Sequence, residues 1–251
     1  MWTQVQINGL DVFTQYPSPF SPGPLQPDVL TGGLDAAQVR TRDAHHEAGH
    51  AVIGMAEGLP VSLAVLGAGS AENPTPPGAY AESGNVSVGP FAVAPLDSVL
   101  AFHVAGVRAA HRWLDQEQLL TPATAFLNDV VAGVGDQAKL RSVDAAQPVL
   151  FTYGTGRPQQ VPDGWDHVEL ATVYARVDGL VERYWPYIAS VAGHLLAHGR
   201  ADAEDLAVLF PRAQRPNGRS ELSSSLPPRP SSEIPAVNPP PSRATERSSR
   251  A

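Results

Sequence analysis

Residues 45–58, with the sequence HHEAGHAVIGMAEG, constrain the fold of this chain more than any other stretch. His46, Glu47 and His50 have the spacing H-E-x-x-H, with small residues between the histidines and an apolar run after them. Because residues four apart share one face of a helix, both imidazoles can reach one ion, and Glu47, about 100° further round, can reach a water beside it. The spacing predicts a helix that carries two metal ligands and a general base. The competing interpretation is a pair of surface histidines on an amphipathic helix.

A third protein ligand is required, because two histidines leave zinc with too few ligands. The chain contains no cysteine, so the ligand must be Asp, Glu or His. The positions at which metzincins carry Gly and His are Ile53 and Ala56 here, which excludes that class. A helix expected at about 122–142 carries Asp129 and Asp136. Both aspartates are therefore candidates for the third ligand.

The pattern of breaks and apolar runs predicts a mainly α fold with a small β-sheet. Asp35 is a suitable N-cap for the motif helix, which is expected to run to about Glu57, where Gly58-Leu59-Pro60 stops it. Two β-type runs, 61–67 and 85–93, flank a Gly/Pro-rich loop and are expected to pair beside this helix. Further helices are expected at about 96–118, 122–142 and 168–199, with a short final helix from about Ala201.

The two ends of the chain differ in composition from the part between them. Residues 1–34 are expected to form an extended Pro/Gly-rich segment, and residues 212–251, rich in Pro, Ser and Arg, to be disordered. Residues 1–211 contain ten basic and 22 acidic residues, which argues against nucleic acid as the main partner. The chain has neither a signal-peptide pattern nor an apolar run of about 18 residues. A soluble, cytoplasmic protein without a membrane segment is expected.

Several segments together resemble one known family. HEAGHA at 46–51 resembles the motif in the peptidase domain of FtsH, an ATP-dependent membrane zinc protease. GLPV follows the motif helix, and AGVRAA at 105–110 is similar to the A-G-R-A-A stretch of that family. GVGDQAKL at 133–140 is similar to its G-x-x-D-x-x-x-A element, and 181–209 look like its last two helices. The resemblance covers roughly residues 36 to 210.

The resemblance implies an FtsH-like, zincin-like helical metallopeptidase domain over residues 35–211. It implies Zn²⁺ as the cofactor, with His46, His50 and Asp136 as its ligands and Glu47 as the general base. Asp129 remains the second candidate for the third ligand. The expected activity is that of a zinc metalloendopeptidase, which hydrolyses peptide bonds of peptides or unfolded proteins through a zinc-activated water.

The chain also departs from the FtsH pattern. The only lysine is Lys139, and Ala138 precedes it, so the Gly-Lys pair of a phosphate-binding ATPase loop is missing. Cleavage is therefore expected to be independent of ATP, and any ATPase or oligomer partner would be separate. His111 replaces the glutamate that usually follows A-G-R-A-A. These departures leave an alternative open, a non-catalytic binding or regulatory protein that keeps the peptidase fold.

Overall fold

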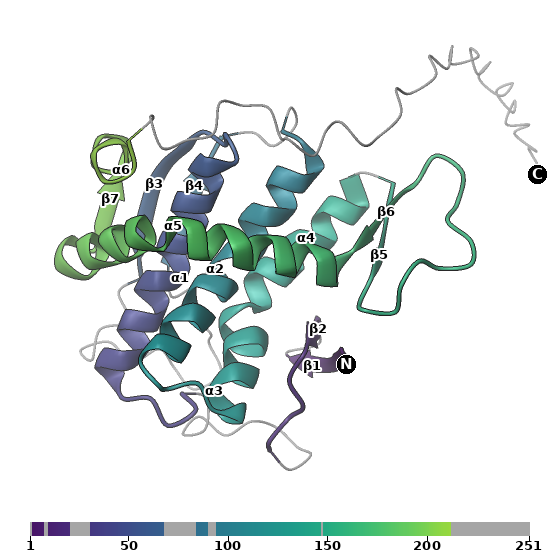
Figure 1. Cartoon of the computed structure of the whole chain (residues 1–251), viewed down its shortest axis with the longest axis horizontal. Coiled ribbons are helices and arrows are strands. Elements are labelled where there is room, and N and C mark those ends of the chain that lie inside the picture. Colours follow the sequence, from purple (N-terminus) through teal and green to yellow (C-terminus); the bar gives the residue numbers. More distant parts are fainter. Residues whose placement is uncertain are drawn as a thin grey trace, which may run out of the picture. The chain divides into compact units, whose positions relative to one another are not determined.

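A computed structural model describes residues 2–7, 10–20, 31–67, 84–89, 94–146 and 148–211. Contacts divide the chain into Met1–Gly218 and Arg219–Ala251, and all of the described residues lie in the first unit. This unit is mainly helical with three small sheets, as the sequence predicts for the fold class (Figure 1). The tail at 212–251, expected to be disordered, lies outside the described residues. Within them, no helix is both long enough and apolar enough to cross a bilayer.

The motif helix is α1 (Ala36–Ala56). Its first turn is closed by a capping box, in which Asp35 accepts a hydrogen bond from the Gln38 backbone N–H (2.8 Å) and the Gln38 side chain accepts one from the Asp35 N–H (2.9 Å). Gly58 takes a positive φ of 82° just beyond the last turn. Every residue from 42 to 56 is buried, so α1 is the central helix. The predicted start and end of this helix are confirmed.

Two long helices pack against α1, and they form most of the main core with it. They are α2 (Leu96–Gln116) and α5 (Leu170–His198), and Figure 1 shows α5 crossing the other two. The contact of α1 with α2 is close, because a Cβ on Gly49 would lie 2.6 Å from the Ala109 Cβ and 2.7 Å from the Ala105 carbonyl oxygen. Small residues are therefore needed on both helices where they meet.

A small antiparallel sheet lies beside α1. Its order is β4 (Gly84–Val88), β3 (Val61–Leu66), β7 (Arg200–Asp202). The pairing of β3 with β4 was predicted from the sequence and is confirmed. Strand β7 was not predicted from the sequence. It has three residues and lies between α5 and the last described helix, α6 (Ala203–Leu209).

The prediction of a single helix at 122–142 is wrong in one respect, because the helix is interrupted in the middle. It consists of α3 (Pro122–Leu127), a π-helical turn η3 (Asn128–Ala132) and α4 (Val134–Ala146). The Gly133 N–H donates to the carbonyl of Asn128, five residues earlier (3.0 Å). The Asn128 side chain donates to the Val107 carbonyl on α2 (3.0 Å), which holds the turn against that helix.

Two further strand pairs have no counterpart in the sequence analysis. The N-terminal segment, expected only to be extended, forms an antiparallel hairpin of β1 (Thr3–Ile7) and β2 (Leu10–Thr14). Between α4 and α5, β5 (Val149–Thr152) and β6 (Asp166–Glu169) pair in parallel. Residues 21–30, most of the loop expected at 68–84 and the end of the β-type run expected at 85–93 lie outside the described residues.

Candidate metal centre

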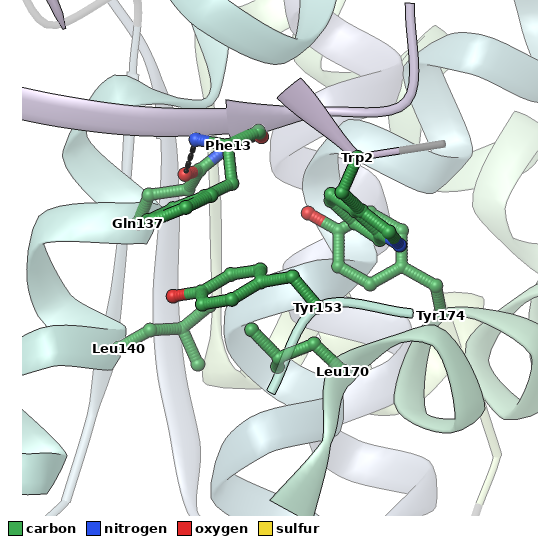
Figure 2. Close-up of a pocket in the computed structure, with 7 residues that line it drawn as sticks. All are labelled: Trp2, Phe13, Gln137, Leu140, Tyr153, Leu170 and Tyr174. Carbon is green, nitrogen blue, oxygen red and sulfur yellow. Dashed lines mark hydrogen bonds between the residues drawn. The ribbon is translucent and has the colours of Figure 1, made fainter. Parts of the chain in front are cut away.

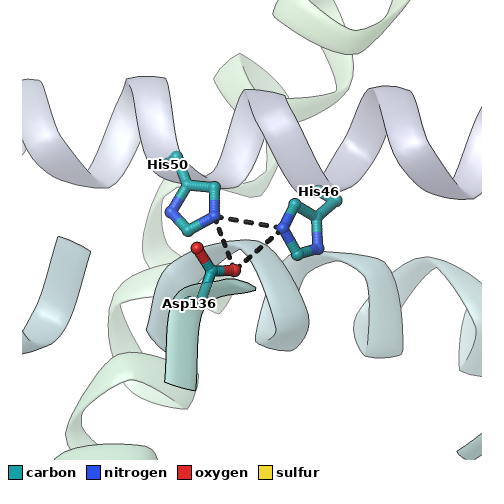
Figure 3. Close-up of side chains that lie close together, drawn as sticks. All are labelled: His46, His50 and Asp136. Atoms are coloured by element: carbon teal, nitrogen blue, oxygen red, sulfur yellow. Dashed lines mark hydrogen bonds and ion pairs between the residues drawn. The ribbon is translucent and has the colours of Figure 1, made fainter. Parts of the chain in front are cut away.

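Three side chains from two helices meet in the interior (Figure 3). The Asp136 Oδ2 atom lies 3.0 Å from His46 Nε2 and 3.1 Å from His50 Nε2, and the two Nε2 atoms are 3.1 Å apart. His46 and His50 come from successive turns of α1, and Asp136 comes from the first turn of α4. Each residue is at most 6% exposed. Two residues predicted from one motif and a third from 86 positions away in the sequence therefore form one group.

A backbone carbonyl fixes the orientation of the His50 ring. Its Nδ1 atom lies 2.6 Å from the carbonyl oxygen of Phe102 on α2. Because a carbonyl can only accept, Nδ1 carries the proton, and in the neutral ring Nε2 keeps its lone pair free for the group. The Nδ1 atom of His46 is buried and has no hydrogen-bond partner among the described residues. No sequence pattern singled out Phe102.

The charges in the group favour an ionised carboxylate. Burial alone would raise the pKa of Asp136, but the charge of His50 and the hydrogen bonds of both histidines hold it well below its usual range. Burial alone would lower the pKa of His50, but Asp136 raises it. A divalent cation would stabilise the same carboxylate and would displace the proton from the imidazole.

The donor set and its dimensions fit a zinc ion. Two imidazole nitrogens and one carboxylate oxygen are typical protein ligands of catalytic zinc, which keeps a fourth position open. Ligand bonds of about 2.0–2.1 Å in a tetrahedron place neighbouring ligand atoms about 3.3 Å apart. The three observed separations are 3.0–3.1 Å. Outward movements of a few tenths of an ångström would therefore be enough to accept the ion.

Gly106 on α2 leaves room for the ligand atoms. A Cβ at this position would lie 2.3 Å from His50 Nε2 and 2.6 Å from His46 Nε2. Any larger residue would therefore push into the two nitrogens that face Asp136. In the sequence, Gly106 stood out only as part of AGVRAA. Its signal was a glycine in the interior of a predicted helix, where glycine costs about 1 kcal/mol relative to alanine and so calls for a reason.

Glu47 lies beside this group, under the edge of the small sheet. Its side chain is 4% exposed, and a Cβ on Gly84 of β4 would lie 2.6 Å from its Oε1 atom. Burial raises the pKa of Glu47, although His46 and His50 act in the opposite direction. A carboxylate with a raised pKa is a better proton acceptor than an exposed one.

Asp129, the second candidate for the third ligand, is not part of the group. Its Oδ2 atom accepts a hydrogen bond from Thr14 Oγ1 of β2 (2.8 Å). Burial raises its pKa to about 6, although the Thr14 bond and the charge of Arg108 lower it. Among the residues that the structure describes, His46, His50 and Asp136 are the one set of three or more potential ligands that could share an ion.

These features define a candidate centre for a single metal ion. No known family model matches the sequence, and no curated protein matches it either.

Proposed function

We propose that the chain is a zinc-dependent metalloendopeptidase with a zincin-like domain of the FtsH type. The observation that carries this proposal is the buried group of His46, His50 and Asp136, with Glu47 on the same turn of α1. The H-E-x-x-H spacing accounts for three of these residues, and α4 supplies the fourth. A purely structural polar cluster would require neither an acid beside the histidines nor a glycine over their ligand atoms.

The four residues have separate roles in this proposal. His46, His50 and Asp136 hold Zn²⁺, and the Phe102 carbonyl keeps the His50 ring in the tautomer that can ligate. When bound, zinc supplies the Lewis acidity that activates water and polarises a peptide carbonyl. Glu47 accepts the proton that the attacking water loses and later delivers it to the leaving amine. Its buried position favours the first transfer, because burial raises its pKa and so makes it a stronger base.

The substrate class is peptides and unfolded protein segments. β4 is at one edge of the sheet order β4-β3-β7 in the part of the chain that the structure describes. An extended substrate added to that edge would pass Glu47, which contacts Gly84 at the start of β4. The chain lacks the Gly-Lys pair of an ATPase loop, so cleavage is proposed to be independent of ATP.

Glu47→Gln tests the role of the base. The variant is expected to bind zinc as the wild type does and to cleave a fluorogenic unfolded casein about 100-fold or more slowly, which is the usual loss when a general base is removed. Glu204→Gln is the matched control, because Glu204 is exposed at the start of α6. Equal cleavage by the Glu47→Gln variant and the wild type would refute the proposal. Stoichiometric zinc in a wild type that cleaves no substrate would favour the non-catalytic binding protein.

A further inference from the structure

Strand β2 is bound by a side chain that imitates a neighbouring strand (Figure 2). The Phe13 N–H donates to Gln137 Oε1 (2.8 Å), and Gln137 Nε2 donates to the Phe13 carbonyl (2.7 Å). One carboxamide thus satisfies both main-chain groups of a single residue, as the next strand of a sheet would. These two bonds depend on an extended backbone and not on the identity of the residue that carries it.

The half-buried side chain of Phe13 forms one wall of a small aromatic pocket. Its ring stacks on Tyr153 with a centroid distance of 3.7 Å and an interplanar angle of 16°. The rest of the lining is apolar or aromatic: Trp2, Leu140, Leu170 and Tyr174. The pocket between these side chains measures about 10 Å³, roughly enough for one water molecule. A ligand ring could therefore stack on Tyr153 only by taking the place of Phe13.

The pocket and the candidate metal centre share a helix. Gln137 directly follows Asp136 in α4. Burial raises the pKa of Tyr174 in the pocket, the charges of Asp129 and Asp136 raise it further, and the charge of Arg108 acts in the opposite direction. A peptide held by Gln137 would therefore contact the helix that carries Asp136.

Contacts specific to this chain secure the residues that follow Phe13. Thr14 donates to Asp129, and the Tyr16 hydroxyl lies 2.6 Å from His111 Nε2, with the two rings stacked. His111 is the position at which the sequence departs from the A-G-R-A-A-Glu pattern. The N-terminal segment thus has its own anchors directly after Phe13, whose main-chain contact any extended chain could make.

We propose that Gln137 and the aromatic pocket form a subsite for an extended peptide with an aromatic side chain, and that β2 occupies this subsite as an internal competitor. Gln137 binds the peptide main chain, and Tyr153 stacks on its aromatic ring. The identification of this peptide as the substrate rests on the proposed peptidase function, whereas the binding itself does not. With β2 in place, a peptide binds only in the fraction of molecules whose Phe13 has left the pocket.

Binding of a labelled peptide tests the proposal without requiring turnover. The probe is the chain's own residues 10–17, LDVFTQYP, blocked at both ends, and the protein is the full chain with Glu47→Gln. Adding Phe13→Ala to the protein is expected to tighten binding of the probe about tenfold or more, because the substitution weakens the competing contact of β2. Gln137→Leu should remove binding, and a probe with Ala in place of Phe should not bind. Glu204→Gln, at an exposed position of α6 that has no contact with β2 among the described residues, is the control and should change nothing.

A second measurement uses the unaltered protein, in case the Phe13→Ala variant does not fold. A saturating concentration of the probe should speed hydrogen exchange at the Phe13 amide about tenfold or more, and the Ala probe should not. Unchanged exchange, or equal binding of the Phe and Ala probes, would overturn the proposal. Binding without any cleavage by the wild type would refute the peptidase function alone. Cleavage without probe binding would refute the subsite alone.

Discussion

Gly106→Ala is expected to abolish zinc binding while leaving the fold in place. The added Cβ would lie 2.3 Å from His50 Nε2, whereas ordinary contact begins at 3.4 Å. The imidazole would have to retreat by about 1 Å, and metal–ligand bonds tolerate deviations of about 0.2 Å. We therefore expect zinc affinity to fall at least about 100-fold, the upper end for perturbed ligand orientation.

The effect on stability should be small by comparison. Alanine in a helix interior gains up to about 1 kcal/mol over glycine, and overpacking costs about 1–3 kcal/mol. The zinc-free variant is therefore expected to lose at most about 2 kcal/mol of its free energy of unfolding. Gly193→Ala in α5 is the matched control, because a Cβ there meets no atom of the described residues within 4 Å. It should gain up to about 1 kcal/mol and keep its zinc affinity.

Competition with a chromophoric zinc chelator measures the affinities of the three proteins, and urea unfolding of the zinc-free forms measures their stabilities. If the Gly106→Ala variant bound zinc as tightly as the wild type, the ligand atoms could not lie where we place them. If it failed to fold while Gly193→Ala folded, the close approach of α2 to the histidines would be structural, and the account of Gly106 as space for the ligands would be wrong.

Two further predictions concern stability. The pKa of Asp129 is raised from 3.8 to about 6, so its ionisation opposes folding, and stability should fall as the pH rises from about 4 to above 6. Asp129→Asn, which carries no charge, should therefore stabilise the protein at pH 7 by up to about 3 kcal/mol and change little at pH 4. Urea unfolding at both pH values measures this, and a gain of equal size at the two values would contradict it. Asp35→Ala removes the side-chain cap of α1 and should cost about 1 kcal/mol at pH 7. Thermal unfolding would show this loss, and an unchanged midpoint would mean that the cap is dispensable.

The sequence was most informative where a local pattern determines a local structure. Asp35 and Gly58 mark the ends of α1, and Gly199, with a φ of 73°, ends α5 where the sequence indicated. The H-E-x-x-H spacing placed two histidines on one helical face. These features depend on residues within one or two turns of each other, so no tertiary information was needed.

The choice between the two aspartates depended on a feature that periodicity does not reveal. Asp129 and Asp136 are seven residues apart, so in an unbroken α-helix they would share a face. The π turn at Asn128–Ala132 adds a residue to the helical turn and removes that register. Asp129 then contacts Thr14, and Asp136 contacts the histidines. The turn depends on a bond from Asn128 to α2, which is a tertiary contact.

The N-terminal hairpin was missed for a similar reason. Residues 17–33 are rich in Pro and Gly, and this composition led to an extended segment being expected throughout residues 1–34. Gln137 and Asp129 hold strand β2, and His111 holds Tyr16 just after it; all three are more than 90 positions away in the sequence. A short strand pair of this kind has little stability alone, so its sequence carries little signal.

The most direct test of the account is the zinc content of the purified wild type beside Asp136→Asn and Asp129→Asn, two variants that remove one carboxylate each and keep the shape of the side chain. We predict stoichiometric zinc in the wild type and in Asp129→Asn, and its loss in Asp136→Asn after dialysis against a chelator. Zinc kept by Asp136→Asn and lost from Asp129→Asn, or a wild type that takes up no zinc, would contradict the placement of a metal ion between α1 and α4.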